Sequence, residues 1–169
     1  MNTTALPTQL SRIQRNAGDA YLRLQLNHQT PAVVAMEHTQ EVLVVPAGRI
    51  TPMPNMPACV LGLLNQRSRV LWVVDLPQML DLQAFDADVQ QYNIAIVRVG
   101  NIPLGLVVQE VKGVMRLTAA SLQPPMGTVA PGLIAYLRGC ILQQTEVLLV
   151  LDAEAIVHSP VLQGNQLFH

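Results

Sequence analysis

The sequence has few charged residues: they make up 12% of its 169 residues, about half the usual share in soluble domains. Half of the residues are hydrophobic, so an unusually apolar surface is expected. Large apolar surface with little charge is typical of sites that contact proteins or membranes. The basic residues are scattered, with Lys112 the only lysine, and no basic stripe forms. This charge distribution argues against nucleic acid as a main partner.

Cysteine is also scarce, and long apolar runs are lacking. Cys59 and Cys140 are too few for a metal cluster or a disulfide scaffold, so we expect two buried free thiols. No run approaches the ~18 apolar residues of a membrane span, and Met1 to Arg15 lack the apolar centre of a signal peptide. These features predict a cytoplasmic protein that does not insert into a membrane.

Catalytic and cofactor motifs are missing as well. The four histidines form no i,i+4 pair and have no neighbouring cysteine at ligand spacing, and no glycine-rich phosphate loop precedes a lysine. We therefore expect no cofactor and no metal, and nothing in the sequence points to an enzyme. Asp75 and Asp152 end equivalent apolar runs, which raises an aspartate-dependent hydrolase as an alternative. Because each is followed by a helix-like segment, capping is the favoured interpretation.

The sequence does contain many short strand patterns. Residues 21–26 alternate apolar and polar side chains, as a half-buried strand does. Residues 70–74, 94–99 and 147–151 are more uniformly apolar and rich in β-branched residues, which is typical of strands buried on both faces. Turn residues separate these runs, so the pattern favours a sandwich or barrel. Helices are expected after Asp75 and after Asp152, and residues 9–17 form either another helix or a frayed terminus.

These strands are arranged as an internal repeat. The same order of strands, turns and polar segments occurs twice at an offset of about 71 to 77 residues, an interval long enough for a whole folding unit. The repeat predicts two small β-barrel subdomains, 20–82 and 90–158, that share a hydrophobic seam. They form one domain over 18–160, with an N-terminal extension (1–17) and a C-terminal tail (161–169).

Four segments of the sequence form a recognisable set: "EHTQEVLVVP" (37–46), "PMPNMPACVLGLLNQRSRVLWVVDL" (52–76), "GLVVQEVKGVMRL" (105–117) and "YLRGCILQQTEVLLVLDAEAIV" (136–157). Together they resemble the CheW-like domain of chemotaxis coupling proteins, over about residues 18 to 160. The resemblance implies a mostly β fold of two SH3-like five-stranded β-barrel subdomains. It also implies a non-catalytic adaptor that links a chemoreceptor's cytoplasmic tip to the regulatory domain of a CheA-like histidine kinase.

The resemblance also implies where partners bind. Glu41 and Arg67 take the positions of a charged pair beside the receptor-facing groove, and the polar turn "NQRSR" (65–69) becomes a hairpin whose arginines bind. The full set of candidate protein-binding residues is Glu41, Val42, Val44, Gly62, Leu64, Asn65, Arg67, Arg69 and Gly139. For the apolar strand members of this set, a place in the core is the competing interpretation.

The sequence departs from the family pattern at several positions. Thr39 replaces a valine, Gln66 a leucine and Ser68 the glycine of the turn, while Trp72 and Val73 stand near the usual proline. A lost glycine at a position of positive φ costs about 1 kcal/mol or reshapes the turn. The departures leave open a second function, regulation of pilus-driven motility or phototaxis, in place of swimming chemotaxis.

Overall fold

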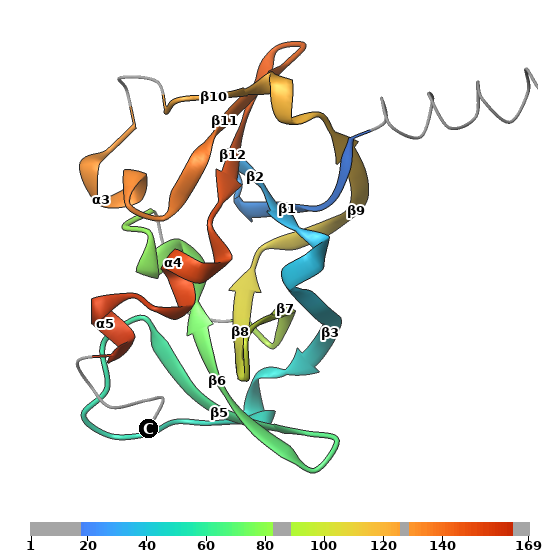
Figure 1. Ribbon diagram of the computed structural model, residues 1–169. Coiled ribbons are helices and arrows are strands. Elements are labelled where there is room, and N and C mark those ends of the chain that lie inside the picture. The colour runs from blue at the N-terminus through green and yellow to red at the C-terminus, as the bar shows by residue number, and fades with distance from the viewer. Residues whose placement is uncertain (1–17, 83–88, 126–128, 164–169) are drawn as a thin grey trace, which may run out of the picture.

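A computed structural model describes residues 18–82, 89–125 and 129–163 of the chain. Two curled six-stranded sheets make up most of it (Figure 1). The strand order of the first sheet is β10 (Leu122–Gln123), β11 (Leu137–Gln143), β12 (Glu146–Leu151), β2 (Thr30–Ala35), β1 (Asp19–Asn27) and β9 (Glu110–Leu117). The strand order of the second is β3 (Thr39–Pro46), β7 (Gln91–Val99), β8 (Ile102–Val108), β6 (Arg69–Asp75), β5 (Val60–Gln66) and β4 (Ile50–Thr51).

Short helices connect these strands. They are η1 (Met36–His38), η2 (Ala47–Arg49), α2 (Leu76–Met79), η3 (Ala119–Ser121), α3 (Pro131–Ile134), α4 (Ala153–Val157) and α5 (Pro160–Gln163). The prediction of a mostly β fold with two similar lobes is therefore confirmed. Each sheet has six strands where five were expected, because each also contains one strand of only two residues, β4 or β10. The predicted helix over residues 9–17 lies outside the described residues.

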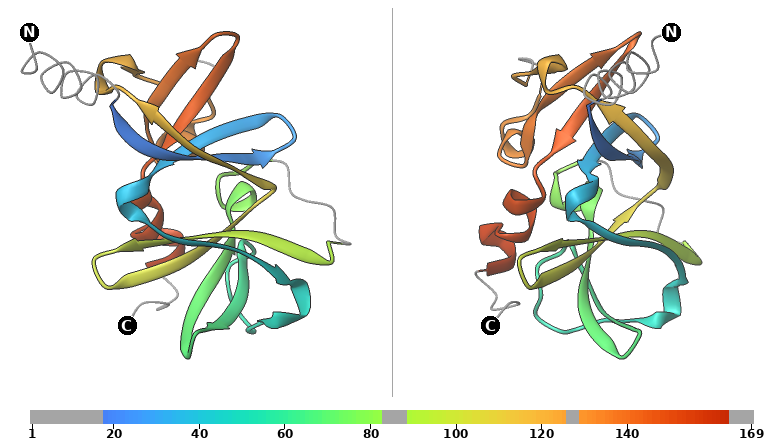
Figure 2. Two further views of the ribbon diagram at one scale, coloured as in Figure 1. Left: turned by 90° about the vertical axis from the view of Figure 1, so that its right-hand side faces the viewer. Right: turned by 45° about the vertical axis from the view of Figure 1, so that its right-hand side comes forward.

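The two halves of the repeat exchange their first hairpins. Hairpin β1–β2 lies in the first sheet, where β1 pairs with β9 and β2 runs parallel to β12. Hairpin β7–β8 lies in the second sheet, between β3 and β6. Figure 2 shows the blue hairpin beside orange strands in one lobe, and the yellow-green hairpin beside teal and green strands in the other.

The prediction that residues 20–82 and 90–158 form separate barrels therefore does not hold, because each sheet takes strands from both ranges. The repeat shows which strands are equivalent, for example β2 and β8. It does not show whether β2 pairs with β6 of its own half or with the equivalent strand β12 of the other half, because both pairings fit the same sequence pattern. The predicted tail also needs correction at its start, because residues 160–163 form α5 and Leu162 is fully buried in the core.

The largest part of the core lies between the two sheets, where the shared seam was expected. Leu24 from β1, Val74 from β6, Leu106 from β8 and Ile156 from α4 are fully buried in it. Each sheet also encloses a smaller hydrophobic cluster of its own. The cluster in the second sheet includes Leu64, and the cluster in the first includes Leu148. Since β1 contributes Leu22, Leu24 and Leu26 to the shared core, its predicted alternation is confirmed.

Candidate functional site

An ion pair lies at the tip of hairpin β5–β6. Arg67 Nη2 is 3.2 Å from Glu41 Oε1, and the exposed fractions of the two side chains are 78% and 22%. Glu41 lies on β3 with Leu43 and Val45, which face the interior of the second sheet. The side chain of Arg67 therefore extends from the tip of hairpin β5–β6 to β3, the strand at the other edge of the same curled sheet. An exposed pair of this kind contributes about 0 to 1 kcal/mol to folding, so stability is not a sufficient reason for it.

The turn that carries Arg67 has an uncommon backbone. Arg67 and Ser68 have φ values of 52° and 63°, and they connect Gln66 and Arg69, which pair across the hairpin. Two successive residues of positive φ form a type I′ turn, whose second position favours glycine. The turn therefore keeps the expected geometry although Ser68 stands in place of glycine.

Replacing Ser68 by glycine is expected to stabilise the protein. The change removes the steric strain of a side chain in the left-handed region and raises the free energy of unfolding by about 0.5 to 1 kcal/mol. Urea unfolding of Ser68→Gly against the original protein measures this. Ser68→Ala retains a Cβ and serves as the control, with little change expected. A less stable glycine variant would contradict this account of the turn.

The other candidate residues divide into exposed and buried groups. Val42 and Val44 on β3 are 44% and 58% exposed, and Val70, which no sequence argument selected, is 61% exposed on β6. Asn65 and Arg69 are exposed at the hairpin end, and the backbone oxygen of Asn65 accepts a 2.9 Å hydrogen bond from Arg49 Nη2. We call Glu41, Val42, Val44, Arg67 and Arg69 the hairpin patch.

Three candidates, Gly62, Leu64 and Gly139, are buried, so none of them presents a side chain at the surface. Leu64 is fully buried in the interior of the second sheet, because it faces inward on β5. Gly62 and Gly139 have φ values of 144° and 155°, and a Cβ on either would overlap a backbone carbonyl oxygen, of Thr51 or Gln123. Both glycines allow a two-residue strand to approach its neighbour closely.

The first sheet also has an ion pair beside its hairpin turn, which the sequence did not indicate, but its other partner is on β1, the counterpart of β7, and not on β9, the counterpart of β3. Arg23 Nη2 on β1 lies 3.0 Å and 2.8 Å from the two carboxylate oxygens of Glu146, beside the turn of hairpin β11–β12. In the second sheet the hairpin contributes the positive charge of its pair, Arg67. In the first sheet the hairpin contributes the negative charge, Glu146. In the sequence Arg23 lies between Leu22 and Leu24, which are buried. This alternation was the signal that the Arg23 side chain lies on the other face of the strand, where it can pair with an acidic residue.

Asp75 and Asp152 cap helices. Asp75 Oδ1 accepts from the backbone N–H of Gln78 at 3.2 Å, and Asp152 Oδ1 accepts from that of Ala155 at 3.1 Å. Burial raises the pKa of the Asp75 carboxyl, and the hydrogen bond from Gln78 opposes that rise. The capping prediction is confirmed, and the hydrolase alternative gains no support from this geometry.

Metal-ligating side chains and thiols are the other groups that could carry chemistry. Over residues 18–82, 89–125 and 129–163, no group of three or more His, Cys, Asp or Glu side chains is placed to hold a metal ion. Cys59 and Cys140 are buried free thiols, as predicted. Burial raises the pKa of the Cys59 thiol, and the nearby Asp75 carboxylate adds to the rise. Within the same ranges, no helix is both long and apolar enough to cross a membrane.

Comparison with known proteins gives consistent relatives. The family model for the CheW-like domain matches residues 20–161. The chemotaxis protein CheW of Rhizobium meliloti is 27% identical over 109 residues, which cover 64% of this chain and 70% of that protein. The CheW of Thermotoga maritima is 27% identical over 115 residues, covering 68% and 74%. The crystal structure of the scaffolding protein TtCheW from Thermoanaerobacter tengcongensis superposes with a TM-score of 0.67 at 20% identity, covering 80% of this chain and 89% of that one.

Proposed function

The chain belongs to the CheW-like domain family, and from this membership we propose that it is a non-catalytic scaffold that couples receptors to a histidine kinase. Its partners in this proposal are the cytoplasmic tip of a methyl-accepting chemotaxis-type receptor and the regulatory domain of a CheA-like kinase. The protein acts in the cytoplasm and reaches membrane receptor arrays through these partners. Its task is to hold the two proteins together in a fixed arrangement.

The observation that carries the proposal is the hairpin patch. It combines Val42 and Val44, exposed on the outer face of β3, with the ion pair between Arg67 and Glu41, whose carboxylate belongs to the alternate face of that strand. In a protein contact, apolar area supplies affinity and charge supplies orientation. A receptor's helical hairpin offers amphipathic helices, which dock on apolar strips flanked by charge. We therefore assign the patch to the receptor.

The ends of the two lobes provide the remaining contacts. Leu142 and Val147 face each other across hairpin β11–β12 and are both exposed. In the proposal this end binds the kinase regulatory domain. Each contact is modest, so stable assembly depends on many simultaneous contacts in an array rather than on one tight interface.

Reversing the charge of Arg67 tests the proposal. Arg67→Glu places two carboxylates together in the hairpin patch, so binding to the receptor fragment encoded in the same genome is expected to weaken about tenfold or more. The melting temperature should change by no more than a few degrees, because an exposed charge contributes little to folding. Titration calorimetry and thermal unfolding measure the two effects.

Two further variants make the result specific. Lys112→Glu reverses a charge on β9, where Lys112 pairs with Glu110 at 3.3 Å, and should leave receptor binding unchanged. The double variant Glu41→Arg with Arg67→Glu restores an ion pair but not the original placement of charge. Unchanged binding by Arg67→Glu would remove the patch from the proposal, and failure of the original protein to bind either partner would end the proposal itself.

A further inference from the structure

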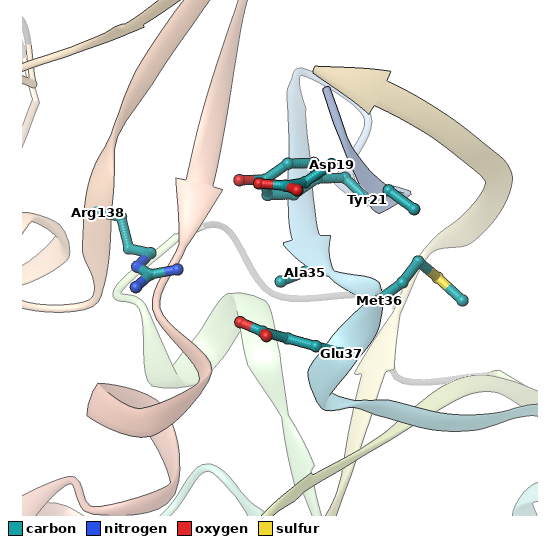
Figure 3. Close-up of a pocket in the computed structure, with 7 residues that line it drawn as sticks. Asp19, Tyr21, Ala35, Met36, Glu37 and Arg138 are labelled. Atoms are coloured by element: carbon teal, nitrogen blue, oxygen red, sulfur yellow. The ribbon is translucent and has the colours of Figure 1, made fainter. Parts of the chain in front are cut away.

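A cavity of about 230 Å³ lies where β1 begins, β2 ends and β11 begins. Asp19, Tyr21, Glu37 and Arg138 line it, together with apolar Ala35 and Met36. In Figure 3 the guanidinium of Arg138 points across the cavity toward the carboxylates of Asp19 and Glu37. Hairpin β1–β2 with the following η1 and the distant strand β11 thus direct two negative charges and one positive charge into the same space.

These charges do not neutralise one another. Among the described residues, Asp19 and Arg138 form no ion pair within 4.0 Å, and Glu37 approaches only His38, at 3.6 Å. Elsewhere the protein does pair its opposite charges, as Arg23 with Glu146 and Arg67 with Glu41 show. The two carboxylates outnumber the guanidinium, so the cavity has an acidic excess.

The direction of Arg138 has a backbone cause. Leu137 pairs with Leu151 and Gly139 with Val150, so Arg138 is the extra residue of a β-bulge. A bulge redirects the side chain of its extra residue and is common beside functional sites. The equivalent bulge before Gly62 places Leu61, which packs against the interior of the second sheet. The same bulge position is therefore occupied by an apolar packing residue, Leu61, in the first half of the repeat and by Arg138, which forms no ion pair within the described residues, in the second half.

The exposure of these charges decides between a free small molecule and a protein. Asp19, Glu37 and Arg138 are all exposed, and an exposed ion pair changes a binding constant by about fivefold at most. A few such contacts do not offset the translational and rotational freedom that a free small molecule loses on binding. A side chain of a protein that already docks nearby loses far less, because the rest of the interface holds it in place.

We propose that this cavity is a socket for a basic side chain of the receptor-type partner. The lysine or arginine enters between Asp19 and Glu37, and an acidic side chain next to it on the partner pairs with Arg138. This inference rests on the proposed function, since it extends the surface assigned to the receptor. Glu37 and Glu41 are four positions apart, which limits their Cα atoms to about 14 Å, a distance within the length of one helix of the partner.

Charge reversal at the socket tests this inference. Glu37→Lys and Arg138→Glu are each expected to weaken binding of the receptor cytoplasmic fragment by about fivefold or more in titration calorimetry at low salt, because a charge reversal removes one attraction and adds a repulsion. Glu37→Gln and Arg138→Gln, which only remove charge, should have smaller effects in the same direction. Because all four changes are at exposed positions, circular dichroism and melting temperature should match those of the original protein.

Glu110→Lys, an exposed reversal on β9, is the matched control and should bind normally. The result that would overturn the socket is normal binding by Glu37→Lys and Arg138→Glu while Arg67→Glu still weakens it. In that case the hairpin patch and the proposed function stand without the socket. If the original protein fails to bind the receptor fragment, that result contradicts the proposed function itself, and the socket, which depends on it, is rejected as well.

Discussion

Gly62→Ala is expected to destabilise the protein by about 3 to 5 kcal/mol, a large fraction of the stability of a domain of this size. At a φ of 144°, an added Cβ would lie 2.1 Å from the carbonyl oxygen of Thr51. The obstacle is backbone and not a flexible side chain, so strand β4 must move away from β5. Both the strained φ and the displaced strand contribute to the loss. Urea unfolding measures it.

Gly48→Ala is the matched control for this prediction. Gly48 lies three residues before Thr51, in η2, and an added Cβ there would meet nothing within 4 Å. Its substitution should change the free energy of unfolding by less than about 1 kcal/mol. Gly139→Ala should behave like Gly62→Ala, because its Cβ would lie 2.4 Å from the carbonyl oxygen of Gln123. Equal stability of Gly62→Ala and Gly48→Ala would refute the close approach of β4 and β5.

Leu64→Ala is the second large effect, with an expected loss of about 3 to 5 kcal/mol. Leu64 is fully buried and packs in the interior of the second sheet, so truncation leaves a cavity that the curled strands cannot fill. Chemical denaturation gives the change in free energy. Receptor binding, measured where the variant is still folded, should be nearly unchanged because the side chain does not reach the surface.

Val44→Ala should show the opposite combination. Its side chain is 58% exposed on the outer face of β3, so the stability change is expected within about 0.5 kcal/mol. Under the proposed function the same change weakens receptor binding, because it removes apolar area from the hairpin patch. Comparing the two variants in both assays separates core from interface. Loss of stability in Val44→Ala without loss of binding would reverse the assignment of these two residues.

The strands were predictable from sequence because their patterns are local. Alternation in residues 21–26 and uniform apolarity in 94–99 and 147–151 identify β1, β7 and β12, and the aspartates at 75 and 152 identify two helix starts. The pairing of the strands was not predictable in the same way. A repeat makes β2 and β8 equivalent, so sequence patterns do not distinguish β2 beside β12 from β2 beside β6.

The candidate site was predictable only in part. The pairing of Glu41 with Arg67 followed from the family resemblance, and the structure contains that ion pair. Leu64 and Val44 look alike in sequence, since both are aliphatic residues on short strands, and only the direction of each side chain separates them. The Arg138 socket was missed because it depends on a bulge, and one extra residue in a strand leaves no periodic signal.

The exchange of hairpins affects how the chain folds as it leaves the ribosome. Hairpin β1–β2 emerges early, but β9, to which β1 pairs from Asp19 to Gln25, and β12, which flanks β2, are synthesised much later. At roughly 5–20 residues per second, the nascent hairpin waits several seconds with Leu22, Leu24 and Leu26 uncovered. All strands of the second sheet lie within residues 39–108, so that sheet can be completed while the first sheet still lacks β9 to β12, and hairpin β1–β2 remains without its partner strands during that interval.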